Sequence, residues 1–163
     1  MLDNLQTAIY EIKHQIKINS DIRKLLYYDT RDALLRSEVS ILDIDPYIFL
    51  SPVFEINSTP PYDKTTFISI HLAKGETDDE ENLLNSVLRI NILTRNDLWE
   101  INNQKIRPLE IANLIIKELD NRKVAISNKL FFVSVESSIL DKNTTGYILL
   151  FGLVEGGGLE DEF

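Results

Sequence analysis

The residues that could do acid–base or metal chemistry are few in this sequence. The chain has two histidines, His14 and His71, and no cysteine, which excludes thiolate metal sites, cysteine nucleophiles and disulfides. Neither histidine belongs to an HExxH pattern or to a nucleophile motif, and the Walker lysine and the zinc spacings are missing. Surface or packing roles are favoured for both histidines. We therefore expect no enzymatic activity, no cofactor and no metal.

Carboxylates are the most concentrated chemical groups in the chain. Five lie within residues 76–81 and four within residues 155–163, and neither stretch holds Lys or Arg. The members of the first stretch are Glu76, Asp78, Asp79, Glu80 and Glu81, and those of the second are Glu155, Glu160, Asp161 and Glu162. The first stretch lacks the alternating ligand spacing of a calcium loop, and a run of adjacent acids is typical of a solvated loop.

The two acidic stretches account for the net charge. The chain carries 17 basic and 26 acidic residues, a net charge of −9, and removing the nine clustered acids leaves 17 of each sign. This balance argues against sequence-independent binding of nucleic acid through a broad basic face. Gly156–Gly158 precede neither a Lys-Ser/Thr pair nor a helix, so residues 156–163 are expected to form a flexible acidic tail rather than a phosphate cradle.

Two groups of aromatic and arginine residues are candidates for protein contacts. Trp99 lies near Arg95 and Arg107 in the sequence, and Tyr27 and Tyr28 lie near Arg31. Such groupings are favoured in protein interfaces. Alternatively, Trp99 caps the local core and the tyrosines pack under a loop, and the sequence leaves both interpretations open.

Helical spacing predicts three helices. Apolar residues at steps of three and four predict the first helix over about residues 2–18. Ser20 is the expected N-cap of a second, short helix. Pro108 suits the first position of a third helix that runs to about residue 120, where Asn121 is expected to take a left-handed cap conformation.

Alternating residues predict about five strands. They lie near residues 48–56, 67–72, 87–93, 131–135 and 147–154, with a possible short strand at 98–101 before a turn at Asn102 and Asn103. Pro46 and Pro52 place the first strand at a sheet edge. The second and third strands are expected to pair through the acidic loop. On the strand near 131–135, Phe131, Val133 and Val135 are expected to share one face.

The last strand is apolar on both of its faces. Tyr147, Leu149, Phe151 and Leu153 lie on one face, and Ile148, Leu150 and Val154 lie on the other. Tyr147 and Phe151 are candidate interface residues. The strand is expected to be central and covered on both faces, or covered on one face by another chain. The prediction is an α+β fold for residues 1–155, a single domain. In it a mainly antiparallel sheet is packed by an N-terminal helix pair and by one helix after the third strand.

The N-terminus lacks the pattern of a secretory signal, and the longest apolar run, Tyr147–Phe151, is far shorter than the roughly 20 residues of a membrane span. We therefore expect no export by a standard signal and no membrane partner.

This order of elements resembles the tail-terminator and head–tail joining (neck) proteins of long-tailed bacteriophages. The segments 97–101 and 106–112 resemble the approach to that family's second major helix, and Gly146–Phe151 resembles its final strand. The resemblance implies a non-enzymatic virion subunit in the tail or neck, assembled in the host cytoplasm. It implies a ring, usually a hexamer, that caps the tail tube, contacts tail-tube and neck proteins, and lets DNA pass without specific binding.

Within that resemblance, two hypotheses concern the acidic stretches. Residues 76–81 are expected to line the ring's lumen or reach an adjacent ring. Residues 155–163 are expected to become ordered on assembly, with Leu159 and Phe163 as apolar anchors. Two alternatives stay open: another connector, such as an adaptor or stopper ring, or a cellular binding module that uses the acidic loop to recognise a basic protein.

Overall fold

The computed structural model describes residues 3–51, 64–77, 83–125 and 128–155. The helices in these ranges are α1 (Asp3–Lys17), α2 (Ser20–Tyr27), α3 (Ile41–Ile44) and α4 (Arg107–Leu119), with 3-10 turns η1 (Ala33–Leu35), η2 (Asp45–Tyr47) and η3 (Asn96–Leu98). The strands are β1 (Ile48–Phe49), β2 (Thr66–Thr77), β3 (Leu83–Arg95), β4 (Glu100–Ile101), β5 (Lys105–Ile106), β6 (Lys123–Val124), β7 (Asn128–Ile139) and β8 (Thr144–Glu155). None of the described helices is long and apolar enough to cross a membrane.

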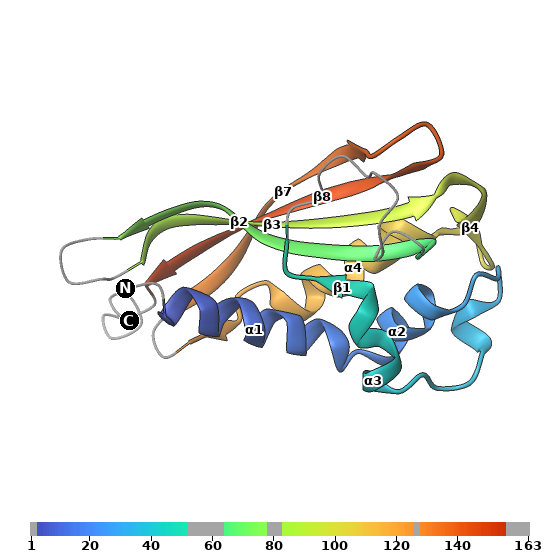
Figure 1. Ribbon diagram of the computed structural model, residues 1–163, viewed down its shortest axis with the longest axis horizontal. Coiled ribbons are helices and arrows are strands. Elements are labelled where there is room, and N and C mark those ends of the chain that lie inside the picture. Colours follow the sequence, from blue (N-terminus) through green and yellow to red (C-terminus); the bar gives the residue numbers. More distant parts are fainter. Residues whose placement is uncertain (1–2, 52–63, 78–82, 126–127, 156–163) are drawn as a thin grey trace.

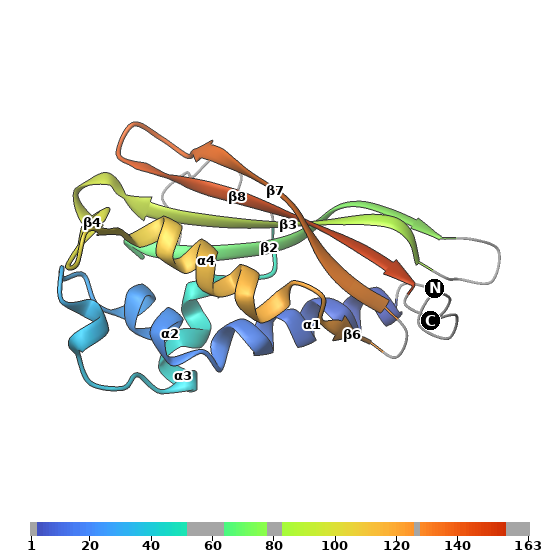
Figure 2. The same ribbon diagram turned by 180° about the vertical axis from the view of Figure 1, so that it is seen from behind.

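The fold is α+β, as predicted. Six strands form one sheet in the order β1-β2-β3-β8-β7-β6, and β4 and β5 form a separate small hairpin. All neighbouring strands are antiparallel except the parallel pair β1 and β2. Figures 1 and 2 show the helices on one side of the large sheet, so the sheet has a covered inner face and an outer face directed away from the helices.

The core lies between the inner face and the helices. Alternate residues of β3 and β8 face inward in register, with Leu88 opposite Phe151 and Ile90 opposite Leu149. All four side chains are buried. From the helices, the core receives buried apolar residues that include Ile12, Ile16, Leu25, Leu26, Ile111 and Ile115. The apolar face of each helix, which repeats every three to four residues, thus packs against the inward-facing alternate residues of the strands.

The helix boundaries follow the sequence signals with one correction. Asn19, not Ser20, caps α2, because its side-chain oxygen accepts a hydrogen bond from the Ile22 N–H at 3.0 Å. Ser20 is the first helical residue, and its hydroxyl donates to Glu38 instead. Asn121 has φ 63°, which confirms the left-handed conformation expected just after α4.

The strands differ from prediction in two places. The predicted strand at 48–56 is reduced to the edge strand β1 in the described residues, and Pro46 belongs to η2. In β7, a register shift between Phe132 and Ser134 interrupts the alternation. Phe131 therefore pairs with Gly152 on the outer face, and Val135 lies opposite Leu149 on the inner-face side. The expectation that these residues share one face is wrong because the extra bulge residue reverses the alternation.

Strand β8 is central, between β3 and β7, but helices cover only one of its faces. Leu149, Phe151 and Leu153 are buried on the inner face, whereas Ile148 and Leu150 on the outer face are only half-buried. Within the described residues, β8 is therefore fully covered on its inner face only, and its cover by another chain stays a prediction.

Candidate functional site

Trp99 lies between η3 and β4, at one end of the large sheet. Its indole Nε1 donates a hydrogen bond to the Thr94 carbonyl oxygen at 3.3 Å, and its ring centroid lies 5.8 Å from that of Tyr147 on β8. Both aromatic side chains are half-buried. The structure therefore brings together two of the contact residues nominated from the sequence, although they are 48 positions apart in the chain.

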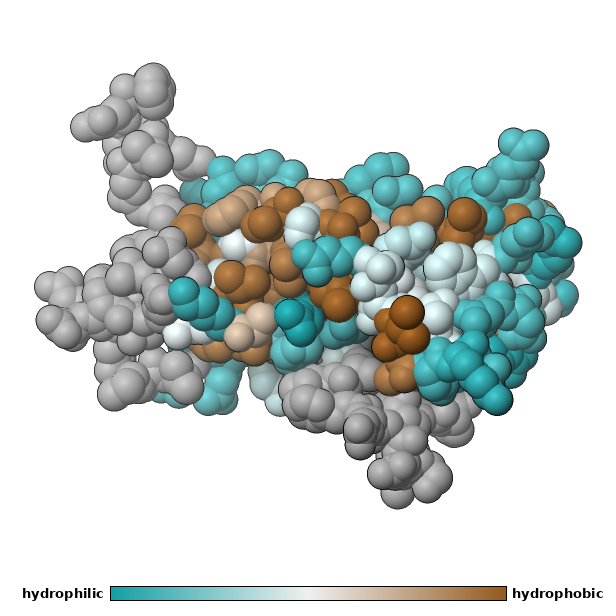
Figure 3. Space-filling model, turned by 90° about the horizontal axis from the view of Figure 1, so that it is seen from above, coloured by the Kyte–Doolittle hydropathy of each residue, from teal (hydrophilic) through white to brown (hydrophobic). Residues whose placement is uncertain are grey.

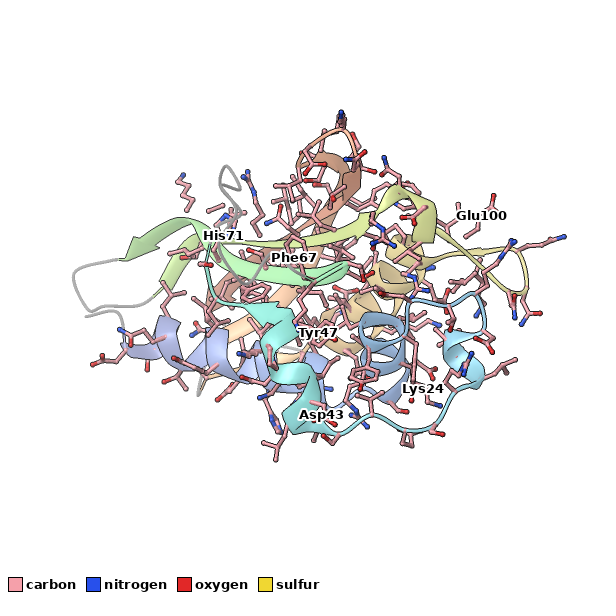
Figure 4. All side chains as sticks on the ribbon, turned by 45° about the vertical axis from the view of Figure 1, so that its right-hand side comes forward. Lys24, Asp43, Tyr47, Phe67, His71 and Glu100 are labelled. Atoms are coloured by element: carbon pink, nitrogen blue, oxygen red, sulfur yellow. The ribbon has the colours of Figure 1, made fainter. Side chains whose placement is uncertain are left out.

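An open pocket of about 570 Å³ lies beside Trp99. Trp99 and Ile106 provide its apolar lining, and the Ile106 side chain is 38% exposed. Arg31 and Glu100 form an ion pair at its border, with 3.0 Å between Nη2 and Oε2. Figure 4 labels Glu100 at this end of the molecule.

Arg95 and Asp97 form a second ion pair at the pocket, with 2.6 Å between Nε and Oδ1. This hydrogen bond lowers the pKa of the Asp97 carboxyl and raises the pKa of Arg95. Thr145, also in the lining, donates its hydroxyl hydrogen to Asn96 Oδ1 at 2.6 Å. An aromatic and aliphatic lining bordered by ion pairs is typical of a protein contact site.

Arg107, which the sequence grouped with Trp99 as a contact residue, is buried inside the subunit at 1% exposure. Its guanidinium donates hydrogen bonds to the backbone carbonyl oxygens of Leu25 (2.6 Å), Tyr28 (2.8 Å), Thr30 (2.7 Å) and Leu98 (3.0 Å). Burial lowers the pKa of Arg107, and the charge of Asp29 opposes that shift. The surface role expected for Arg107 is therefore corrected to an internal one.

The backbone N–H of Arg107 donates a further hydrogen bond, to the Trp99 carbonyl oxygen at 2.7 Å. Together with the bond to Leu98, this contact fixes the backbone that carries the indole. Arg107 thus positions the pocket without facing it.

The other aromatic candidates lie in different places, one in the core and one at the surface. Phe151 is fully buried, with its ring edge-on to Phe132 at 5.7 Å, so it packs the core and is not part of the free surface. Tyr27 is 44% exposed and contacts Tyr28 at 5.1 Å between ring centroids. Arg31, expected beside these tyrosines, pairs with Glu100 instead.

The outer face of the sheet carries apolar side chains that the sequence did not nominate as a site. Phe131 and Val133 of β7 are 40% and 54% exposed. Ile148 and Leu150 of β8 are half-buried beside them. Figure 3, which views the molecule from above, shows hydrophobic residues gathered over much of this face. The sequence signal that could have indicated this surface is the apolar character of both faces of β8, because the predicted helices cover only one of them.

Polar groups interrupt this apolar surface on β2 and β3. Arg89 lies between His71 on β2 and Leu150 on β8, directly opposite both in register. Burial lowers the pKa of His71, and the Arg89 charge lowers it further. Among the described residues, His71 Nδ1, Arg89 Nε and Asn91 Nδ2 are buried atoms without a hydrogen-bond partner. Figure 4 shows His71 on its strand, labelled.

Several predicted residues fall outside this description. Glu76 belongs to β2, but Asp78, Asp79, Glu80 and Glu81 lie outside the described residues, as do Leu159 and Phe163. The hypotheses for the acidic loop and for the C-terminal tail therefore stay predictions. Among the residues that the structure does describe, no three His, Asp or Glu side chains are grouped as a metal site would require.

Comparisons with known proteins match a family model and a solved structure. The YomW family model matches residues 19–152. No curated protein matches the chain. Among solved structures, a chain from the virion of a native gene transfer agent particle is similar, with 14% sequence identity and a TM-score of 0.44, over 90% of this chain and 99% of that one.

Proposed function

This chain belongs to the YomW family, and we propose that it is a structural protein of a phage-type virion. The observation that carries the proposal is the outer face of the sheet. A central sheet buried by helices on one side only, with exposed Phe131 and Val133 on the other, needs a further protein layer to remove that apolar surface from water.

Two further features support an assembly role. The Trp99 pocket combines an anchored indole with bordering ion pairs, the composition of a contact site. The YomW family is phage-derived, which agrees with the resemblance to neck and tail-terminator proteins that the sequence carries.

The finer proposal is a ring, with six copies as the expected number, that caps the tail tube and joins it to the neck. The Trp99 pocket and the outer face are separate surfaces, so one subunit can contact two neighbours at once. Such heterologous contacts close into rings when the rotation between subunits divides a full turn. Tail-tube and neck proteins are the proposed partners, with DNA passing through the channel.

A deletion and complementation experiment tests this function. The gene is deleted from the phage or prophage that encodes it, and particles are counted by electron microscopy with and without the wild-type protein supplied in trans. We expect unjoined heads and tails, or tails of irregular length, to accumulate without it. Normal joined particles that contain none of the protein by mass spectrometry would overturn the proposal.

Two complementing variants refine that experiment. Trp99→Ala removes the indole from the pocket, and we expect it to restore joined particles poorly. Lys24→Ala, which removes a surface ion pair with Glu38 on the helix side, is the matched control and should complement fully. Figure 4 labels Lys24 on that side.

A further inference from the structure

Arg89 is a cation without a counter-ion in the described part of the chain. It projects from the outer face of a central strand, its side chain is half-buried, and its Nε has no hydrogen-bond partner. A half-buried guanidinium costs solvation free energy unless another group supplies acceptors. The residues directly opposite Arg89 on the neighbouring strands accept no hydrogen bond from it. Leu150 is apolar, and His71 Nδ1 makes no hydrogen bond.

The chemistry of this position indicates its ligand. A guanidinium fork matches a carboxylate, with which it forms short, charge-assisted hydrogen bonds. Asn91, two positions along β3, is buried at 6% exposure, so the half-buried Arg89 guanidinium is the donor group that β3 presents here. Apolar side chains of β7 and β8 flank this donor group, so the ligand should carry apolar residues beside its carboxylates.

A second copy of the same face is a poor ligand. Two outer faces packed about a two-fold axis would bring two Arg89 cations and two sets of unpartnered donors into one dry interface. Like charges so placed destabilise an interface. The complementary segment must therefore come from a different, acidic part of the partner.

The chain itself contains a segment with the required chemistry. Residues 159–163 read Leu-Glu-Asp-Glu-Phe, three side-chain carboxylates between two apolar residues. The other acidic stretch, 76–81, has no apolar residue. Eight residues follow Glu155, enough chain to span about 27 Å when extended, which suffices to reach a neighbouring subunit.

We propose that the outer face around Arg89 binds the C-terminal segment 159–163 of a second copy of this chain. The Arg89 guanidinium would bind its carboxylates, and Leu150 and Phe131 would contact its apolar residues. This inference rests on the proposed function, because it supplies one head-to-tail contact of the proposed assembly. It makes the outer face a specific receptor rather than a general apolar surface.

A peptide-binding experiment tests the receptor. A fluorescent peptide of residues 156–163 is titrated into full-length protein whose own tail is neutralised by E160Q, D161N and E162Q, and anisotropy gives the affinity. We expect Arg89→Gln to weaken binding by about tenfold to a hundredfold, the usual effect of losing a charge-assisted hydrogen bond. Arg36→Gln, at an exposed arginine that pairs with Asp32, is the matched control and should bind as before.

A charge exchange guards against misfolding of the variant. Arg89→Glu should lose the native peptide and should bind a peptide with Lys at positions 160, 161 and 162, a gain that an unfolded protein cannot show. Equal binding of the native peptide by wild-type and Arg89→Gln protein would overturn the proposal. So would equal affinity for a peptide of residues 76–81, or displacement of the peptide by a short DNA duplex at equal charge concentration.

Mixing two variants tests whether the segment comes from a second copy. Arg89→Gln protein keeps its tail, and the tail-neutralised protein keeps Arg89, so each lacks one half of the contact. Native mass spectrometry of the mixture should show a heterodimer that neither variant forms with itself. The heterodimer could be absent although the tail-neutralised protein binds the free peptide and the Arg89→Gln protein binds it weakly. That result would overturn binding between copies and indicate a contact within one subunit. The virion function is tested separately, by counting joined particles. A negative result in the peptide titration or in the mixing experiment therefore does not contradict the proposed virion function.

Discussion

Arg107 concentrates more hydrogen bonds than any neighbour at the Trp99 pocket, and its partners are backbone atoms. Its guanidinium reaches carbonyl oxygens as far as 82 positions away, in the segment that follows α2 and in α2 itself. A buried charge is tolerated here because several carbonyl dipoles replace the water it lost. The residue therefore joins the N-terminal helices to the start of α4.

We predict that Arg107→Leu lowers the free energy of unfolding by at least about 3 kcal/mol, because four buried carbonyl oxygens lose their donors. Urea denaturation followed by circular dichroism measures the change. Arg31→Leu, which removes only an exposed ion pair, should cost less than about 1 kcal/mol. Equal effects of the two substitutions would contradict the assigned role of Arg107.

His71 gives a second prediction, on pH. Its pKa in the folded protein is lowered by burial and by Arg89, whereas in the unfolded chain it returns to about 6.5. Below that value the unfolded state binds more protons than the folded state, so stability falls as pH decreases from about 6.5 toward the folded pKa.

The measurement compares the unfolding free energy of wild-type and His71→Gln protein between about pH 5 and 7.5. We expect the substitution to flatten the decline in this window. Carboxylates with lowered pKa values, including Asp45 beside Lys17, produce a separate loss of stability at more acidic pH. Identical slopes for wild-type and His71→Gln would show that His71 does not contribute.

Among the elements, the pair β3 and β8 forms the centre of the sheet, and its spacing depends on Gly146. A Cβ at this position would lie 1.8 Å from the Ile92 carbonyl oxygen and 3.1 Å from the Leu93 Cα. Both are backbone atoms of the paired strand and cannot move without distorting the sheet. A glycine is therefore required at this position of β8, where a side chain would overlap the backbone of β3.

We predict that Gly146→Ala destabilises the protein by about 3 kcal/mol, at the upper end of the usual cost of overpacking. Gly152→Ala is the matched control on the same strand. Its Cβ would meet the Phe131 ring at 2.1 Å, but that side chain is 40% exposed and can swing outward. Thermal unfolding should separate the two variants. A melting temperature for Gly152→Ala at or below that of Gly146→Ala would contradict this account.

For the whole molecule, the important asymmetry is between the two faces of the sheet. Helices cover the inner face (Figure 1), and hydrophobic residues gather on the outer face (Figure 3). On β7, Phe131 lies opposite Gly152 and is 40% exposed. Exposed apolar surface of this kind contributes little to the folding of one subunit, whereas its burial stabilises an assembly.

We therefore predict that Val133→Lys changes the free energy of unfolding by no more than about 0.5 kcal/mol, as is usual for a surface substitution, but reduces incorporation of the protein into particles. Leu42→Lys is the control, because Leu42 is 85% exposed on α3, on the helix side. Quantitative mass spectrometry of purified particles measures incorporation. Equal incorporation of both variants would exclude the outer face as an assembly surface.

The sequence by itself determined the local elements of this protein. The helices α1, α2 and α4, the pairing of β2 with β3 and the edge position of the first strand follow from periodicity, prolines and turn residues, which act over a few positions. It also brought Trp99 to attention through its neighbouring arginines, and Tyr147 through its place on a strand that is apolar on both faces.

Only the tertiary structure decided which side chains those elements bury. Arg107 and Phe151 looked available in the sequence and are internal, whereas Phe131 and Val133 are exposed because a bulge and a one-sided helix layer place them there. Arg89 was not singled out at all, since its lack of a counter-ion depends on neighbours from β2 and β8. Burial and pairing are set by segments distant in the chain, and a local pattern carries no information about which distant segment will cover it.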